Sequence, residues 1–417
     1  MQQLAVCVPP LLQPTLVIKL RTDGPMPPAA AEATPHNDVP RPSEGKRPKA
    51  QKHGVHVAAS PGPDRFLFSD LPTREVKALI RAALPAGAPV KLVLAVTAKG
   101  RWRGWAKITA GDEARAAAAV AALDGAVVKG VSLRASRGLG RRDNVFPFLD
   151  RGLRESFELD STAAYSAMDE HTTALLASFL GCVYAECDPA TLSITDACAC
   201  TGACAVVLAR HFRAVDAVEL DAGRCDALRA NVLLCGANVT VHRGDYNALW
   251  EKVRQDIVFL DVPWGGPDYV EAEGSACDAL GGVPLVDVVL RLRRRASAVA
   301  LRLPTKGRFD VDAFAAALVA DSAWAGDEGA EERCLPFRIT THLAHLLVVC
   351  MPGPRFGLRT LDATMAAAHA WDERWRQDVR PAFYDWEAKR WIRASRWIPA
   401  HARRSRPAEG APAASDV

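Results

Sequence analysis

An acidic residue, a proline and a tryptophan follow one another directly after a short apolar run. The run, residues 257–260, consists of Ile, Val, Phe and Leu, which are typical of a buried strand. A carboxylate such as Asp261 and the backbone carbonyl of Val262 can accept the two hydrogens of an exocyclic amine, and an indole can stack on a planar base. The candidate catalytic residues for methyl transfer to such an amine are Asp261, Val262, Pro263 and Trp264.

Periodic segments on both sides of this loop predict a parallel sheet covered by helices. Apolar runs typical of strands alternate with segments of helical periodicity, which favours the α/β class. Open sheets of this kind bind ligands at the carboxyl ends of their strands, where Asp261 lies. The expected strands are 192–197, 214–220, 239–242, 256–260 and 298–303, with a terminal hairpin of 338–344 and 346–351.

The first strand-to-helix turn contains small residues, which allow the backbone to approach a ligand closely. Gly202 is the single glycine left of a usual Gly-x-Gly. The thiols of Cys198, Cys200 and Cys204 lack an evident fourth metal ligand, so we expect them to pack the turn and to hold no metal. The candidate cofactor-binding residues of this turn are Asp196, Ala197, Cys198 and Gly202.

Carboxylates end the next two strands. Glu219 can accept both hydroxyls of a ribose, and Asp221 is a second candidate for that role. After the third strand, Asp245 can accept an adenine amine while the ring of Tyr246 covers the base. These acids lie in register with Asp261, so they predict that this edge binds a nucleoside-containing cofactor.

The loop from Asp261 to Trp264, here called the catalytic loop, resembles the D/N/S-P-P-Y/W signature of amino-methyltransferases, with Val262 in place of the first proline. Its extension from Gly265 to Tyr269 is similar to that of the trimethylguanosine synthase family, the cap-guanine N2 methyltransferases. The resemblance covers about residues 145–353 and implies a Rossmann-like domain that binds S-adenosylmethionine. It also implies capped RNA as the partner and conversion of a 7-methylguanosine cap to its 2,7-dimethyl or 2,2,7-trimethyl form.

The same resemblance assigns further roles. In the family, an aromatic-Ser pair and a Glu that opens a helix line the cofactor and cap pocket; Tyr165 and Glu170 match them here. A basic residue in the family's L-P-R/K-N turn meets the cap phosphates, and Thr305 stands in its place, with Lys306 and Arg308 beside it. Glu170 thus joins the cofactor-binding residues, and the substrate-binding residues are Trp264, Gly265, Tyr269, Tyr165, Lys306 and Arg308.

The N-terminal part predicts a tail and a small domain. Residues 1–63 are rich in Pro and Ala and contain basic residues, which predicts a disordered tail. Residues 64–136 show a β-α-β-β-α-β pattern that starts with a strand at 65–69, which predicts a ferredoxin-like α+β domain. A basic, Gly-containing linker follows.

Two strings in that domain, Phe66 to Leu71 and Arg103 to Ala110, are similar to the ribonucleoprotein motifs of RNA-recognition modules. Trp105 takes one stacking position, whereas Leu67 and Lys107 take the others. The domain is therefore either an RNA-binding module or a degenerate one that serves packing or protein contacts. The surface expected to touch RNA consists of Lys99, Trp102, Arg103 and Lys107.

The C-terminal part, residues 354–406, predicts a Trp- and Arg-rich helical extension, followed by a disordered end at 407–417. Trp371 and Trp375 are one helical turn apart, so they either dock a helix onto the core or form a platform for RNA bases. Docking is the interpretation that we favour, because large aromatic side chains mostly serve burial.

Composition limits the class of protein. The 417 residues are 49% hydrophobic and 24% charged, as in globular proteins, and the net charge of +4 permits an RNA partner without requiring one. No apolar run is long enough to span a membrane, and no secretion signal is evident. With 11 cysteines in no zinc-ribbon spacing, we expect a reducing intracellular compartment, the nucleus or the cytoplasm. The resemblance to the trimethylguanosine synthase family implies the nucleus or a viral replication site.

Two other functions fit the same residues. The core of the catalytic loop also serves adenine N6 methylation of RNA or DNA, and the extension to Tyr269 is the feature against it. A non-enzymatic RNA- or cap-binding protein built on a decayed methyltransferase is the other alternative, supported by the changed turn residues.

Overall fold

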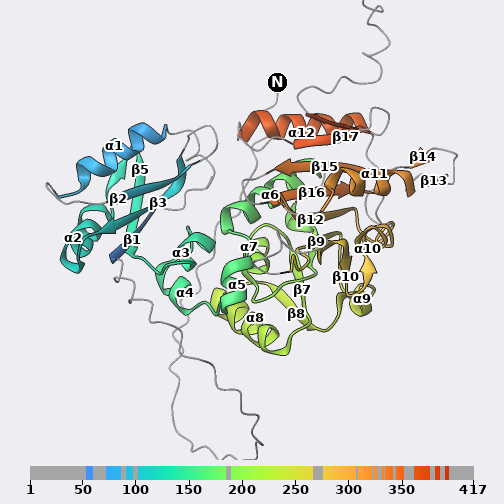
Figure 1. Ribbon diagram of the computed structural model, residues 1–417, viewed down its shortest axis with the longest axis horizontal. Helices are drawn as coiled ribbons and strands as arrows, with labels where there is room; N and C mark the ends of the chain where they lie inside the picture. The colour runs from blue at the N-terminus through green and yellow to red at the C-terminus, as the bar shows by residue number, and fades with distance from the viewer. Residues whose placement is uncertain are drawn as a thin grey trace, which may run out of the picture. The chain divides into compact units, whose positions relative to one another are not determined.

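A computed structural model describes most of the chain after the N-terminal segment (Figure 1). The described residues fall within the compact unit Gln51–Val417. They are residues 53–59, 72–85, 91–96, 102–184, 189–265, 276–306, 309–321, 324–325, 331–332, 334–340, 344–351, 361–375, 381–385 and 390–393.

A five-stranded antiparallel sheet with two helices forms the N-terminal domain. The strand order is β2-β3-β1-β5-β4, which is the split β-α-β order that the sequence predicts, with β4 added at the edge. Helices α1 and α2 contribute Ile80 and Leu123 to the core on one face of the sheet. The elements are β1 (His53–Ala59), α1 (Thr73–Ala83), β2 (Lys91–Val96), β3 (Trp102–Ala110), α2 (Glu113–Leu123), β4 (Val127–Val128) and β5 (Val131–Arg137).

The first strand is not where the sequence placed it. Strand β1 lies within the segment predicted as a disordered tail. This part of the segment is ordered because Val55, Val57 and Ala59 alternate into the core and β1 pairs with both β3 and β5. The predicted strand at 65–69, and with it the first ribonucleoprotein-like string, lies outside the described residues.

The second string is described, and it corrects one expectation. Trp102 is fully buried in the domain core and donates its indole N–H to the carbonyl of Trp105 at 2.9 Å. It therefore cannot be part of an RNA-binding surface. Lys99 lies outside the described residues.

The linker after β5 packs against the face of the sheet that carries Trp105 and Lys107. It forms two short helices, α3 (Arg142–Val145) and α4 (Arg151–Ser156). The Lys107 ammonium donates to the carbonyl of Gly140 at 2.9 Å, and His56 Nε2 lies 3.0 Å from the carbonyl of Pro147. In an RNA-recognition module this face would stack bases, so the chain itself covers part of the expected binding surface.

A nine-stranded mixed sheet forms the core of the larger domain, in the order β18-β17-β15-β16-β12-β9-β6-β7-β8. Strands β8, β7, β6, β9 and β12 are parallel, and β16 runs antiparallel to its two neighbours, β12 and β15. The Rossmann-like sheet with a terminal hairpin is therefore confirmed. Its strands are β6 (Ser193–Asp196), β7 (Ala214–Glu219), β8 (Val239–Arg243), β9 (Ile257–Leu260), β12 (Ala298–Pro304), β15 (Leu335–Thr340) and β16 (Ala344–Cys350).

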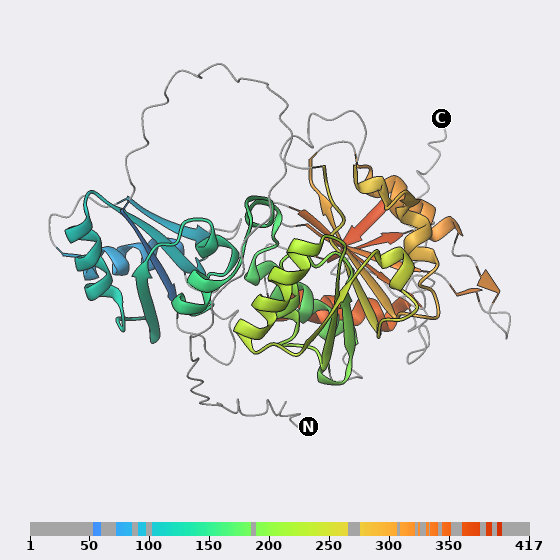
Figure 2. The same cartoon turned by 90° about the horizontal axis from the view of Figure 1, so that it is seen from below.

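Helices cover both faces of this sheet (Figures 1 and 2). In β9, Ile257 and Phe259 join a core built with α6, α7, α8 and α12, while Val258 and Leu260 join a core on the α10 and α11 side. The helices of this domain are α5 (Ser161–Ser166), α6 (Glu170–Val183), α7 (Ala203–Leu208), α8 (Ala222–Cys235), α9 (Tyr246–Leu249), α10 (Leu285–Leu290), α11 (Val311–Asp321) and α12 (Leu361–Trp375). Two short hairpins complete it: β10 (Ala279–Leu280) with β11 (Val283–Pro284), and β13 (Trp324–Ala325) with β14 (Glu331–Glu332).

The C-terminal extension is only partly helical. After α12, strands β17 (Pro381–Asp385) and β18 (Arg390–Arg393) extend the central sheet, with β17 paired to β15. The prediction of an all-helical extension is wrong here, because the edge of β15 offers unpaired backbone groups that a further strand can satisfy. The methyltransferase-type sheet therefore continues past the predicted boundary at 353.

No helix in the described part of the chain is long and apolar enough to cross a membrane.

Docking is the role that the structure gives to Trp371. Its side chain is 1% exposed, its indole N–H donates to Ser178 Oγ at 3.1 Å, and its ring meets Phe179 edge-on at 5.2 Å. The predicted docking of α12 is therefore confirmed for this residue.

Replacing Trp371 with Ala should lower the free energy of unfolding by about 3–5 kcal/mol, because the substitution leaves a cavity between α12 and α6. Urea unfolding followed by circular dichroism measures this loss. Leu233→Ala is the control, since Leu233 is 83% exposed and its truncation should change stability by less than about 0.5 kcal/mol. Equal effects of the two substitutions would contradict the docking.

Candidate active site

The register of the parallel strands brings the catalytic loop beside an arginine. Strands β9 and β12 pair with Leu260 opposite Leu301, so the next residues along them are Asp261 and Arg302. The Arg302 Nη1 atom donates to Asp261 Oδ2 at 2.7 Å and to the carbonyl of Ser166 at 2.6 Å. The two side chains are 9% and 18% exposed, so this ion pair is largely shielded from water.

Trp264 contacts the same arginine. The guanidinium carbon of Arg302 lies 4.8 Å from the centre of the indole ring, and the indole N–H donates to the carbonyl of Arg302 at 3.3 Å. Burial raises the pKa of the Asp261 carboxyl, and Arg302 opposes that rise. Val262 is buried, Pro263 and Gly265 are exposed, and Tyr269 lies outside the described residues.

The turn after β6 has the shape of a ligand cradle. Cys200 and Gly202 both have left-handed backbone, with φ of 49° and 88°. A Cβ atom at Gly202 would lie 2.4 Å from Leu228 Cδ1. The Glu219 carboxylate closes this turn, because it accepts the N–H of Cys200 and that of Asp221, each at 2.8 Å.

Asp196 is a buried carboxyl that has no compensating cation among the residues the structure describes. Its side chain is 1% exposed, and neither carboxylate oxygen has a hydrogen bond of normal geometry among the described residues. Burial, together with the nearby Asp261 and Glu219 carboxylates, raises the pKa of Asp196 to about 8, although the Cys198 N–H partly offsets the rise. An orphaned buried carboxylate beside a turn of small residues fits a cationic ligand such as S-adenosylmethionine.

The other predicted cofactor residues differ in their burial and in their hydrogen-bond partners. Ala197 is buried and donates its N–H to the carbonyl of Phe259, beside the turn. Asp221 and Asp245 cap helices α8 and α9, so each has one oxygen bound to a backbone N–H. Tyr246 is 2% exposed and its hydroxyl donates to Gln255, which argues against the predicted covering of an adenine ring.

The Glu170 carboxylate is bound by other parts of the chain. It is 2% exposed, accepts the N–H of Phe148 at 2.9 Å and pairs with Arg210 at 2.6 Å. These bonds fix the linker and α7 to the start of α6, which argues against a cofactor contact. Tyr165 is 47% exposed at the end of α5, close to the Ser166 carbonyl that binds Arg302.

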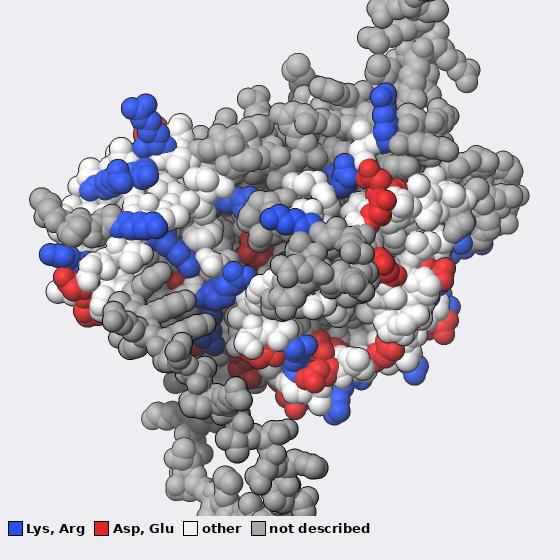
Figure 3. All heavy atoms as spheres, viewed as in Figure 1, with Lys and Arg blue, Asp and Glu red and all other residues white. Residues whose placement is uncertain are grey.

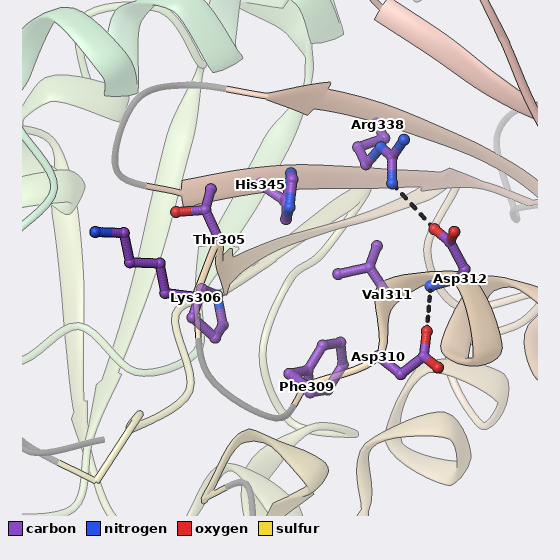
Figure 4. Close-up of a pocket in the computed structure, with 9 residues that line it drawn as sticks. Thr305, Lys306, Phe309, Asp310, Val311, Asp312, Arg338 and His345 are labelled. Carbon is purple, nitrogen blue, oxygen red and sulfur yellow. Dashed lines mark hydrogen bonds and ion pairs between the residues drawn. The ribbon is translucent and has the colours of Figure 1, made fainter. Parts of the chain in front are cut away.

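A hollow of about 360 Å³ opens at the carboxyl end of β12 (Figure 4). Lys306 lines it and forms no ion pair within the described residues; Arg338 lies opposite and pairs with Asp312 at 3.0 Å. The pKa of His345 is lowered by burial and by Arg338, so its ring is neutral at pH 7. Arg308 lies outside the described residues.

The thiols of the turn are packing groups. Burial raises the pKa of Cys198 and Cys204 well above the usual range and that of Cys200 to about 11, so all three are protonated at neutral pH. No group of three or more potential ligands that could hold a metal occurs in the described part of the chain.

Sequence reasoning missed Arg302, Arg338 and His345. Arg302 had a signal, because it is a single charge inside the apolar run 298–304, and a charge in a buried strand needs a partner. Arg338 and His345 gave none, since they lie on the terminal hairpin and reach the hollow only through sheet pairing.

A family model matches part of the chain. Residues 191–314 match the family described as RNA cap guanine-N2 methyltransferase. The resemblance that the catalytic loop indicates is thereby confirmed for this segment, which lies in the methyltransferase domain. Among curated proteins, the chain is 33% identical over 124 residues to an uncharacterized protein of Acanthamoeba polyphaga mimivirus, which covers 28% of this chain and 48% of that protein. The chain therefore spans about half the length of this relative.

Solved structures that resemble the chain include methyltransferases. A precorrin-6y methyltransferase of Geobacter metallireducens is 16% identical, with a TM-score of 0.29 over 47% of this chain and 94% of that one. A methyltransferase of Pyrococcus furiosus is 15% identical, with a TM-score of 0.29 over 42% and 82%. Similarity at this level carries no argument about function, and the fold assignment depends on the strand order itself.

Gly202→Ala should destabilise the protein by about 1–3 kcal/mol for two reasons. The backbone at this position is left-handed, which strains an alanine, and the new Cβ would clash with Leu228. Cys200→Gly is the matched variant in the same turn. It should leave stability unchanged or raise it by up to about 1 kcal/mol, since a left-handed non-glycine residue is strained. Thermal unfolding measures both effects, and a stabilising Gly202→Ala would contradict the conformation of the turn.

The contribution of Asp196 to the stability of the ligand-free protein should fall as the pH rises from about 4 to about 8. The folded-state pKa of Asp196, about 8, lies above its ordinary value of 3.8, so the folded state holds a proton that the unfolded state has lost. Chemical unfolding across this range, compared with Asp196→Asn, measures the effect. Over this range the wild type should lose stability relative to the variant as the pH rises, and identical slopes would contradict the raised pKa.

Proposed function

We propose that this protein transfers a methyl group from S-adenosylmethionine to the exocyclic N2 of a 7-methylguanosine RNA cap, giving the 2,7-dimethyl or 2,2,7-trimethyl form. The observation that carries the proposal is the arrangement of Asp261, Val262 and Trp264 directly after β9, next to the cradle after β6. The match of residues 191–314 to the cap guanine-N2 methyltransferase family supports it.

Methyl transfer requires an amine that is oriented and keeps its lone pair free. Asp261 Oδ1 and the carbonyl of Val262 are two acceptors at the end of one strand, and together they can hold both N2 hydrogens. Neither needs to remove a proton before the transfer. These residues therefore act by orientation.

The cofactor supplies a methyl group on a sulfonium, which is already activated for displacement. Asp196 would face its positive charge, and the small residues of the Cys200–Gly202 turn would allow the backbone to approach it. Glu219 accepts one N–H with each oxygen, so each oxygen keeps a lone pair for a ribose hydroxyl. Asp245 is the residue proposed for the adenine amine.

Trp264 is proposed to stack on the base. A 7-methylguanine ring is positively charged, so an indole face attracts it more than it attracts guanine, by about 1–2 kcal/mol. That difference predicts that cap methylation at N7 precedes methylation at N2. Tyr165 and Tyr269 would complete this pocket.

The hollow at the end of β12 is proposed to receive the cap phosphates (Figure 4). Lys306 lines the hollow, and Arg338 and His345 provide further N–H donors near it. The amine site and the hollow lie at the same edge of the sheet, since Arg302 and Pro304 are two residues apart on β12. Arg308 would add a further cation.

The RNA beyond the cap is proposed to contact basic side chains. On the face shown in Figure 3, Lys and Arg prevail over the N-terminal sheet, whereas acidic and basic groups mix over the larger domain. Because the linker covers part of the sheet face around Lys107, we propose backbone contacts to phosphates there in preference to base stacking.

Trp264→Ala should lower methyl transfer to 7-methylguanosine diphosphate at least 100-fold while the dissociation constant for S-adenosylmethionine changes less than about threefold, because the ring is proposed to contact the base and not the cofactor. Transfer of labelled methyl groups and calorimetry measure the two effects. Trp250→Ala is the matched control, since Trp250 is also flanked by arginines but lies after α9, outside the loop of Asp261 to Trp264.

Guanosine diphosphate and an adenosine-containing oligonucleotide complete the panel of acceptors. Label on 7-methylguanosine diphosphate alone supports the proposal, and label on the oligonucleotide alone would show adenine methylation. Cofactor binding with no transfer to any acceptor would indicate a decayed enzyme. Equal loss of cofactor affinity in Trp264→Ala would contradict the role given to the ring.

A further inference from the structure

Arg302 connects three parts of the candidate active site. It lies on the buried strand β12, and its Nη1 atom reaches Asp261 after β9 and the carbonyl of Ser166 at the end of α5. Its guanidinium lies over Trp264, and its own carbonyl accepts the indole N–H. One side chain thus contacts two of the groups proposed to hold the substrate, Asp261 and Trp264.

The bond from Arg302 determines which oxygen of Asp261 is available. Oδ2 is occupied at 2.7 Å, which leaves Oδ1 to accept a hydrogen from an amine. The carboxylate cannot rotate freely while Nη1 holds it, because the same nitrogen is fixed by Ser166. The geometry therefore orients Oδ1 before any substrate arrives.

The same contact favours the ionised form of Asp261. Other titratable groups act on Asp261 or on Arg302: the Asp196 carboxylate on β6, the protonated thiols of Cys198 and Cys204 in the turn and α7, and Asp169 before α6. Of these groups, Asp196 disfavours the ionised form of Asp261, because two neighbouring carboxylates repel each other. Only an ionised carboxylate presents acceptors alone, and a protonated one would direct a hydrogen at the amine.

Trp264 is fixed by the same residue from two sides. The guanidinium covers part of one ring face, while the bond to the Arg302 carbonyl sets the direction of the indole N–H. Such a cation–π contact is strongest where water is excluded, as it is around a side chain that is 9% exposed. A base would therefore stack on a ring whose position is already set.

We infer that Arg302 is a positioning residue for methyl transfer, which fixes the charge and orientation of Asp261 and the placement of Trp264 without itself touching the reacting atoms. The inference depends on the proposed function, since it assigns Arg302 a part in holding that amine. It goes beyond the family resemblance, because none of the motifs that carry it includes this residue.

The first experiment compares Arg302→Gln and Arg302→Lys with wild type in methyl transfer to 7-methylguanosine diphosphate. Arg302→Gln should lower kcat about 10- to 100-fold and change KM and cofactor affinity much less, because the amine is misplaced. The acid limb of its kcat profile should move up by about one to three pH units, since a neighbouring cation lowers a carboxyl pKa by that amount. Arg302→Lys keeps the charge and should restore the pH profile more fully than kcat.

Arg254→Gln is the matched control. Arg254 also pairs with a buried carboxylate, Asp216, at 3.4 Å, but it precedes β9, away from the carboxyl ends of the strands. Its removal should leave the pH profile unchanged. An unmoved acid limb in Arg302→Gln, or equal profiles in the Gln and Lys variants, would overturn the inference.

A second measurement keeps the inference separate from the proposed function. Without Arg302 the pKa of Asp261 rises further, so the stability of Arg302→Gln should fall more steeply than that of wild type as the pH rises from about 5 to about 8. The double variant Asp261→Asn/Arg302→Gln should lose this extra slope. If wild type methylates no acceptor, the proposed function fails; equal slopes in wild type and Arg302→Gln would instead overturn the role of Arg302.

Discussion

Asp196 and Asp261 end two neighbouring parallel strands, and each makes ionisation of the other more costly. Arg302 provides Asp261 with a fixed counter-charge at 2.7 Å, whereas Asp196 has none among the described residues. In the ligand-free site the pKa of the Asp196 carboxyl is therefore raised to about 8. A cation placed beside Asp196 would lower that pKa and stabilise the carboxylate, so the site would favour a positively charged cofactor over a neutral one.

The turn after β6 keeps its shape although it lacks one of the usual glycines. Cys200 adopts the left-handed conformation that a glycine would adopt without strain, and the Glu219 carboxylate holds its N–H. One acidic side chain thus maintains the backbone of the cradle while keeping lone pairs for a ligand. This arrangement explains how the changed motif remains compatible with a bound cofactor.

The N-terminal domain is joined to the larger domain by a linker that is itself packed. Buried Arg154 pairs with Asp143 at 2.9 Å, and Glu170 binds the N–H of Phe148. Bonds of this kind are costly to break when they are shielded from water, so the linker is a structural element and not a flexible tether. The strand order supports the ferredoxin-like topology of the N-terminal domain, whereas RNA recognition by this domain remains a prediction.

The sequence by itself determined the alternation of strands and helices, the position of Asp196, Glu219 and Asp261 at strand ends, and the catalytic loop. These follow from local patterns, because periodicity and a strand end are properties of a few adjacent residues. The tertiary structure alone decided which strands are neighbours. It placed Arg302 against Asp261, buried Tyr246 and Trp102, directed Glu170 to Arg210, and added β17 and β18 to the sheet. Contacts between residues far apart in the chain depend on strand register and on the face of the sheet from which each side chain projects. Neither can be predicted from the spacing of residues within a single motif.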